Sequence, residues 1–196
     1  MSTLHKQFWP PGVPHDLRVP QVTLNHFVET AARRYPDKPA LIFAERVIAY
    51  RELQQQIEAV AAFLQQRWGV AKGDRVLLMS QNCPQFVIAF YAVLRLGAVV
   101  VPVNPMSTVS EVRYYAANSG AQVACVAQEL LPQVQPLMGA VGEAGVLRAV
   151  LVHAYADGLS EAGVQTLPPA MRDCFAPLKA EGLTAFSEAL EWTGAV

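Results

Sequence analysis

Residues 93–105, VLRLGAVVVPVNP, decide how the whole sequence is interpreted. They end a nearly uncharged run that begins at Phe86, and such a run could either cross a membrane or lie inside a protein core. A membrane-spanning helix needs about 20 apolar residues without interruption. Here Arg95 and Gly97 interrupt the run, and β-branched residues follow directly after Gly97. We therefore interpret the stretch as a helix end, a glycine turn and a buried strand over residues 98–103.

The sequence before this stretch also alternates between expected helices and strands. A β-hairpin is predicted over residues 40–50. Apolar residues at steps of three and four predict a helix over residues 50–68, with Gly69 as its left-handed cap. The run DRVLLMS, residues 74–80, is too short for a helix and is typical of a strand buried on both faces. Pro84 then opens the next helix in its first turn.

The alternation continues after residue 105. The spacing of a capping box predicts a helix over residues 108–118. Strands are expected over residues 122–127 and 147–153, and a helix that two prolines interrupt is expected over residues 130–140. Strands alternating with helices imply parallel pairing. The predicted fold class is α/β, with an open, mostly parallel sheet, helices on both faces, a short β-hairpin and an extended N-terminal arm.

Three regions are expected along the chain. Residues 1–22 contain four prolines and are predicted as an extended arm. Residues 23–153 form the α/β subdomain. Residues 154–196 are punctuated by glycines and prolines and are expected to be rich in loops.

Short helices are expected at both ends of this arrangement. The subdomain should begin with an amphipathic helix over residues 23–35 that Pro36 stops. The expected apolar side of this helix carries Leu24, Phe27, Val28 and Ala31. Near the C-terminus we expect a short helix over residues 170–174 and a last helix or docking segment over residues 183–192.

The composition excludes several classes of protein. Hydrophobic residues make up 53% of the chain and charged residues 16%, which fits an α/β domain or a part of a larger protein. The formal net charge of −1 argues against nucleic acid as a partner. The N-terminus lacks the apolar core of a signal peptide, so a cytoplasmic location is expected. Peripheral membrane contact through exposed apolar patches stays open.

Sequence motifs for catalysis are absent. The chain has no GxxxxGK[ST], GxGxxG, HExxH or GxSxG pattern, and the glycines of GAVGEAG at 139, 142 and 145 lack a preceding strand. The three cysteines have neither disulfide nor metal-ligand spacing and are expected to be reduced: Cys83, Cys125 and Cys174. We therefore assign no catalytic residue and no metal site, and cofactor-binding residues remain unknown.

A few polar residues could still contact a ligand. His153 ends a predicted strand, where ligands of open α/β sheets often bind, but a structural role is favoured. Asn82 lies at a strand-to-helix junction, and capping of the helix is favoured over ligand contact. The other histidines do not cluster with it or with each other: His5, His15 and His26.

The remaining polar candidates have simple structural interpretations. Asn104-Pro105 is a chain-turning device after a strand. Three acidic residues are interpreted as caps and surface charges rather than as a catalytic pair: Glu52, Asp74 and Glu111.

The order of these short stretches resembles the N-terminal region of the adenylate-forming superfamily, and most closely its fatty acyl-CoA synthetases. The arm WPPGVPHDL is similar to the arm of the medium- and long-chain synthetases. Ala49 departs from the family's usual Thr, which bears on stability only. The residues that carry the resemblance are Tyr50, Glu52 and Leu53; Gly73 to Val76; Asn82, Pro84 and Phe86; Arg95, Gly97, Ala98, Pro102, Asn104 and Pro105; and Glu111, Val112, Ser119, Gly120 and Ala121.

The resemblance implies a partial N-terminal domain of a ligase with a two-step reaction. A fatty acid reacts with ATP in the presence of Mg²⁺ to give an acyl-adenylate, and CoA then displaces AMP. In such enzymes the motifs for ATP, CoA and Mg²⁺ lie downstream, and these 196 residues contain none of them. The chain alone is therefore expected to be inactive and to bind no cofactor tightly. Fatty acid, ATP and CoA are the implied substrates, and a homodimer stays open.

Two alternatives remain open from the sequence. The chain could belong to another adenylate-forming enzyme, such as an aryl-CoA ligase, an amino-acid adenylation domain or an oxidising relative. It could also be a non-catalytic binding module built on a degenerate synthetase half. A stop codon after Val196 would favour the module, whereas an open reading frame with a phosphate loop would exclude it.

Overall fold

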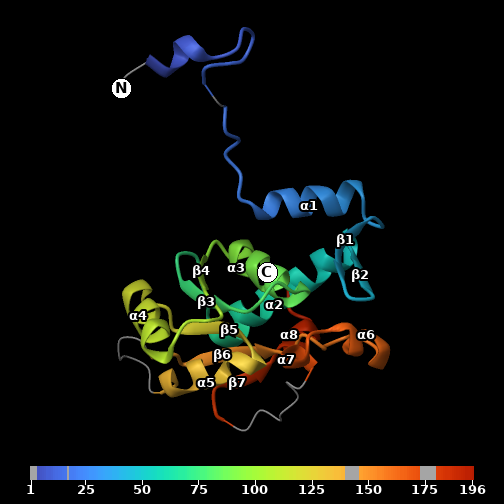
Figure 1. Cartoon of the computed structure of the whole chain (residues 1–196), viewed down its shortest axis with the longest axis vertical. Helices are drawn as coiled ribbons and strands as arrows, with labels where there is room; N and C mark the ends of the chain where they lie inside the picture. Colours follow the sequence, from blue (N-terminus) through green and yellow to red (C-terminus); the bar gives the residue numbers. More distant parts are fainter. Residues whose placement is uncertain (1–3, 17, 140–145, 173–179) are drawn as a thin grey trace.

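A parallel five-stranded sheet forms the centre of the structure, in the strand order β4-β3-β5-β6-β7. The computed structural model describes residues 4–16, 18–139, 146–172 and 180–196 (Figure 1). All neighbouring strands pair in parallel, which confirms the open α/β sheet predicted from the sequence. The strands are β3 (Arg75–Met79), β4 (Val99–Val103), β5 (Val123–Ala127), β6 (Ala149–His153) and β7 (Leu183–Ala185).

Helices cover both faces of this sheet, as predicted (Figure 1). Successive side chains of a strand point to opposite faces, so Leu78 enters one core and Leu77 the other. The first core lies under α1 (Asn25–Arg34), α2 (Tyr50–Trp68), α3 (Pro84–Arg95) and α8 (Phe186–Leu190). The second lies under α4 (Val109–Ser119) and the broken helix η2 (Gln128–Leu130), α5 (Leu131–Val134) and η3 (Gln135–Leu137).

The hairpin consists of β1 (Pro39–Phe43) and β2 (Arg46–Ala49), which pair antiparallel as expected. Its turn contacts the segment after β6, because the Glu45 carboxylate accepts a hydrogen bond from the Ser160 N–H at 2.8 Å. Ser160 caps α6 (Glu161–Thr166), and α7 (Pro169–Arg172) follows. The loop-rich segment therefore also holds the hairpin.

The N-terminal arm carries one short helix. The 3-10 helix η1 spans Leu4–Phe8, within the arm predicted as extended. Figure 1 shows the arm running away from the sheet layers.

Residues 93–105, the apolar stretch that could have crossed a membrane, fold as a helix end, a turn and a strand. Gly97 has a φ of 68° and lies between α3 and β4. The Arg95 guanidinium forms ion pairs with Glu58 at 2.9 Å and Glu29 at 3.8 Å, so it joins α3 to α2 and α1. Among the described residues, no helix combines the length and the apolarity that crossing a membrane would require.

The prediction that residues 98–103 form a buried strand is wrong in one respect. β4 is an edge strand, and Val99 is 46% exposed. Pro102 lies within β4, and proline is tolerated at a sheet edge because its missing N–H is not needed there. The β-branched composition identifies a strand but does not say where the strand lies in the sheet.

Two further predictions are corrected. In α1 only Val28 of the expected apolar side is buried, while Leu24 and Phe27 are more than half exposed and Asn25 is buried instead. The last expected helix begins as strand β7, which pairs with β6 before α8 starts at Phe186. The sheet thus continues beyond residue 153.

Replacing Gly97 with Ala should destabilise the fold by about 1–2 kcal/mol, because an L-residue is strained at this positive φ. Urea unfolding measures the difference in free energy of unfolding. The matched control is Ala44→Gly, because Ala44 has a φ of 51° in the hairpin turn and glycine should relieve strain there. Two changes of the same sign would contradict the assigned turn geometry.

Candidate functional site at the carboxyl edge of the sheet

The sheet has a topological switch point between β3 and β5. From β3 the chain passes to β4 on one side, and from β5 it passes to β6 on the other side. Ligands of open α/β sheets bind outside the carboxyl ends of the strands at such a point. The residues that follow β3 and β5 are therefore the first place to look for a site.

One buried tyrosine occupies this position. Tyr155 follows β6 and is 0% exposed. Its hydroxyl accepts a hydrogen bond from the Gln81 N–H at 3.0 Å and donates one to the Glu129 carboxylate. Gln81 follows β3 and Glu129 follows β5, so Tyr155 joins all three loops at the edge.

The surroundings shift the acidity of both side chains. Burial raises the pKa of the Tyr155 hydroxyl, and its bond to Glu129 raises it further. Burial also raises the pKa of the Glu129 carboxyl, and the hydrogen bond from Tyr155 offsets part of that rise. The pair is suited to hold the loops together, because the hydroxyl keeps its proton.

His153 is the last residue of β6, two positions before Tyr155, and its side chain is 1% exposed. Its ring packs edge-on against the rings of Tyr155 and Phe186, with ring centroids 5.6 Å and 6.0 Å apart. Neither ring nitrogen has a hydrogen-bond partner within the described part of the chain. Burial lowers the pKa of the imidazole to about 3, so His153 is neutral and structural, as the sequence interpretation favoured.

Cys83, and not Asn82, caps α3. The Cys83 Sγ accepts a hydrogen bond from the Phe86 N–H at 3.4 Å. The capping role predicted for Asn82 is wrong because Pro84 occupies the first helical position, which makes the residue directly before it the cap. The side chain of Asn82 is exposed at the edge instead. Burial raises the pKa of the Cys83 thiol.

A small apolar pocket lies beside Asn82, between β1 and the start of α3. Its volume is about 260 Å³. It is lined by Leu41, Ile42, Phe43, Asn82, Cys83, Pro84 and Val87.

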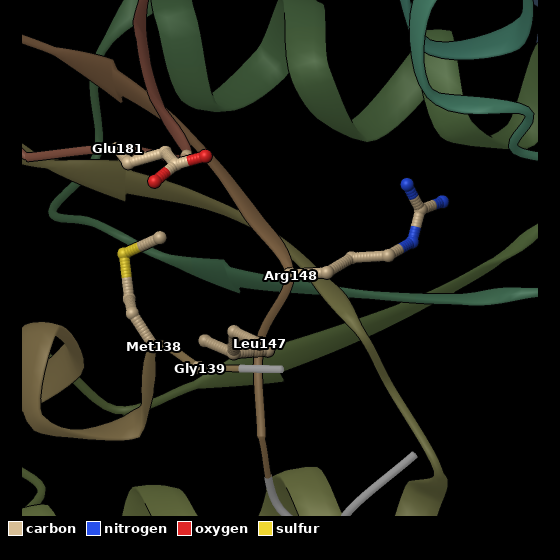
Figure 2. Close-up of a pocket in the computed structure, with 6 residues that line it drawn as sticks. Met138, Gly139, Leu147, Arg148 and Glu181 are labelled. Atoms are coloured by element: carbon tan, nitrogen blue, oxygen red, sulfur yellow. The ribbon is translucent and has the colours of Figure 1, made fainter. Parts of the chain in front are cut away.

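A larger pocket of about 410 Å³ lies at the opposite, amino edge of the sheet. Figure 2 shows that Arg148 and Glu181, two of its lining residues, point away from each other. The Arg148 guanidinium donates a hydrogen bond to the Trp68 carbonyl at the end of α2. Because this edge is not the one where such sheets bind ligands, we assign the pocket no part in a reaction.

The other polar residues considered in the sequence lie apart. The His15 ring packs edge-on against Trp9 in the arm, with ring centroids 5.6 Å apart. The His26 ring packs edge-on against Phe27 on α1, with ring centroids 6.0 Å apart. His5 lies in η1. Within the part of the chain that the structure describes, no three His, Cys, Asp or Glu side chains are grouped as a metal site requires.

The acidic candidates have structural partners. Glu52 pairs with Arg46 at 3.0 Å, and Glu111 closes the predicted capping box on α4. The Asp74 carboxylate accepts a hydrogen bond from the Ala71 N–H, and Asn104 accepts one from the Met106 N–H in a turn, both at 2.9 Å.

Cys125 is buried in β5, and burial raises the pKa of its thiol to about 12. Three residues lie outside the described part: Gly142, Gly145 and Cys174.

Replacing Tyr155 with Phe should cost about 1–3 kcal/mol of unfolding free energy, because the Gln81 N–H and the Glu129 carboxyl lose their shared partner. Amide hydrogen exchange at Gln81 should speed up more than exchange in β6. Tyr91→Phe on α3 is the control and should leave the unfolding free energy and the amide exchange at Gln81 unchanged. Unchanged protection at Gln81 would show that Tyr155 does not fix this loop.

The sequence matches the AMP-binding enzyme family over residues 28–174. This match covers strands β3 to β6 and the three residues joined at the carboxyl edge, Gln81, Glu129 and Tyr155. The chain belongs to the AMP-binding enzyme family.

Relatives of this AMP-binding chain include long-chain fatty-acid–CoA ligases. It is 37% identical over 125 residues to the long-chain-fatty-acid–CoA ligase of Bacillus subtilis. The aligned residues make up 64% of this chain and 22% of that ligase. It is 42% identical over 114 residues to the ligase of that name from Yersinia pestis, which covers 58% of this chain and 20% of the relative. The chain thus spans about a fifth of the length of these curated relatives.

Solved structures show the same fold. An anthranilate CoA ligase, AuaEII, in complex with anthranoyl-AMP superposes with a TM-score of 0.69 at 20% identity. The superposition covers 91% of this chain and 30% of that ligase. The fold class inferred from the sequence is therefore confirmed. The family match and the curated relatives confirm the resemblance to adenylate-forming enzymes.

Sequence reasoning on this AMP-binding chain missed Tyr155 and Glu129. Neither residue belongs to a motif, and they lie 26 positions apart. One signal was available, since both follow predicted strands, and the carboxyl ends of parallel strands meet at one edge.

Proposed function

We propose that this chain forms the N-terminal part of a fatty-acid–CoA ligase. The proposal rests on the 37% identity to the Bacillus subtilis long-chain-fatty-acid–CoA ligase, together with the match to the AMP-binding family. In the reaction, the fatty-acid carboxylate attacks ATP to form an acyl-adenylate and pyrophosphate. The CoA thiol then displaces AMP and forms the thioester. We propose a cytoplasmic location for this reaction, as expected from the sequence.

We propose that residues beyond those described here hold ATP, CoA and Mg²⁺, in line with the expectation from the sequence. Tyr155 at the switch point is fully buried, and its hydroxyl is engaged with Gln81 and Glu129. No phosphate loop occurs in the sequence, and the described acidic residues discussed above are engaged in caps and pairs. We therefore assign this chain a scaffold role and derive no chemical step from its residues.

Fatty-acid-dependent exchange of pyrophosphate into ATP tests the proposed function. The protein to assay is the product of the longest reading frame that contains these 196 residues. We expect exchange with medium- or long-chain fatty acids, and none from the 196-residue chain alone. Exchange with anthranilate or with amino acids, and not with fatty acids, would replace this proposal by another adenylating activity. Exchange by the 196-residue chain would contradict the scaffold role.

A further inference from the structure

The loop after β3 is held at the carboxyl edge by more than one hydrogen bond. The Gln81 N–H donates to the Tyr155 hydroxyl at 3.0 Å, and the Gln81 carbonyl accepts a hydrogen bond from the Ser80 hydroxyl at 2.9 Å. The Tyr155 hydroxyl in turn donates to the Glu129 carboxylate in the loop after β5. Both backbone groups of Gln81 are therefore engaged, and one of them depends on Tyr155.

The backbone next to Tyr155 is fixed as well. The Ala154 N–H donates a hydrogen bond to the Asp157 carboxylate at 2.9 Å, and the Ala154 carbonyl accepts one from the Gln85 side-chain amide at 3.2 Å. Gln85 lies in the first turn of α3 and is 5% exposed. Tyr155 therefore follows a residue that is tied to α3, and its buried hydroxyl can fix the position of Gln81.

This fixed loop carries Asn82 at the edge where ligands of open α/β sheets bind. The side chain of Asn82 is exposed, because Cys83 caps α3 in its place. A buried polar network whose members are satisfied holds its geometry closely. Reactions depend on such geometry, since a displacement of about 1 Å can lower a rate about a hundredfold.

We propose that Tyr155 is a positioning residue of the complete fatty-acid–CoA ligase. Its side chain is fully buried, so it acts by holding residues 80–83 in the geometry that the reaction needs and not by contact with a substrate. The proposal rests on the proposed function for the reaction. It deepens the scaffold role, because it makes the reaction rate depend on one buried hydroxyl.

Fatty-acid-dependent pyrophosphate exchange tests the proposal on the product of the longest reading frame that contains these 196 residues. The assay temperature lies well below the melting temperature of every variant, so that all of them are folded. Tyr155→Phe should lower kcat about tenfold or more and leave the KM for the fatty acid nearly unchanged, because the lost hydroxyl displaces a loop and removes no substrate contact.

A pair of Glu129 variants tests the other end of the junction. Glu129→Gln keeps an acceptor for the Tyr155 hydroxyl and should retain most of the parent kcat. Glu129→Ala removes the acceptor and should lower kcat severalfold.

Two controls separate positioning from stability. Tyr91→Phe removes a hydroxyl from α3 outside the junction, and Ile57→Val lowers stability through the first core. Each control should keep the parent kcat at the assay temperature.

Folded Tyr155→Phe with the parent kcat, or a loss of kcat that Ile57→Val shares, would overturn the proposal. If Tyr155→Phe does not fold, equal kcat values for Glu129→Gln and Glu129→Ala would overturn it. Exchange by the parent with another carboxylate and not with fatty acids would contradict the proposed function alone, and the same variants assayed with that carboxylate would still test Tyr155. A parent without exchange on any carboxylate would overturn both proposals.

Discussion

His153→Phe should make the protein markedly more resistant to acid. Burial lowers the pKa of His153 from 6.5 to about 3, so between these values the unfolded chain binds a proton that the folded chain does not. The free energy of unfolding of the parent protein is therefore unaffected by His153 above pH 6.5 and decreases as the pH falls from 6.5 towards 3. The loss should reach on the order of 4 kcal/mol. Phenylalanine keeps the edge-on contacts with Tyr155 and Phe186 and cannot be protonated.

Urea unfolding of both proteins at a series of pH values from about 7 to about 3 measures this effect. The difference between the two curves removes the contribution of the carboxyl groups, including Glu129, whose raised pKa acts in the opposite direction. His26→Phe, on the surface of α1, is the control and should follow the parent. Parallel curves for His153→Phe and the parent would show that the buried imidazole does not limit acid stability.

Phe63→Ala should cost about 3–5 kcal/mol of unfolding free energy. The Phe63 ring is fully buried in α2 and meets Trp68 at 4.9 Å and Trp192 at 5.4 Å, both edge-on. The Trp192 indole N–H also donates a hydrogen bond to Gln66 at 3.1 Å. The change therefore removes core packing and loosens the C-terminal residues from α2.

Denaturant unfolding followed by tryptophan fluorescence and by far-ultraviolet circular dichroism measures both effects. We expect a lower midpoint by both probes and a red-shifted native emission as Trp192 becomes more exposed. Phe27→Ala is the matched control, because Phe27 is 55% exposed on α1. An equal, small loss for both variants would contradict the placement of Phe63 at the centre of the first core.

Local signals in the sequence were sufficient for the central elements. The helix Tyr50–Trp68 has the predicted bounds, because its apolar period and Gly69 specify both the buried face and the end. Thr108 and Glu111 close the predicted capping box for the same reason. These features depend on residues within one or two turns of each other, so one sequence can reveal them.

Features that depend on distant partners could not be predicted in this way. The place of β4 at the edge follows from which strands pair, and the pairing of β7 with β6 joins residues about 30 positions apart. Pro102 was compatible with an edge strand but did not require one. The Tyr155–Glu129 contact was hidden for the same reason, since it arises only when three strands end side by side.

A chimera tests the scaffold role most directly. In it, the matched 125 residues of the Bacillus subtilis ligase are replaced by the corresponding residues of this chain. If this chain is the N-terminal scaffold of such a ligase, the chimera should catalyse fatty-acid-dependent pyrophosphate exchange within about tenfold of the parent rate. A chimera that folds and melts like the parent but shows no exchange with any fatty acid would contradict the account.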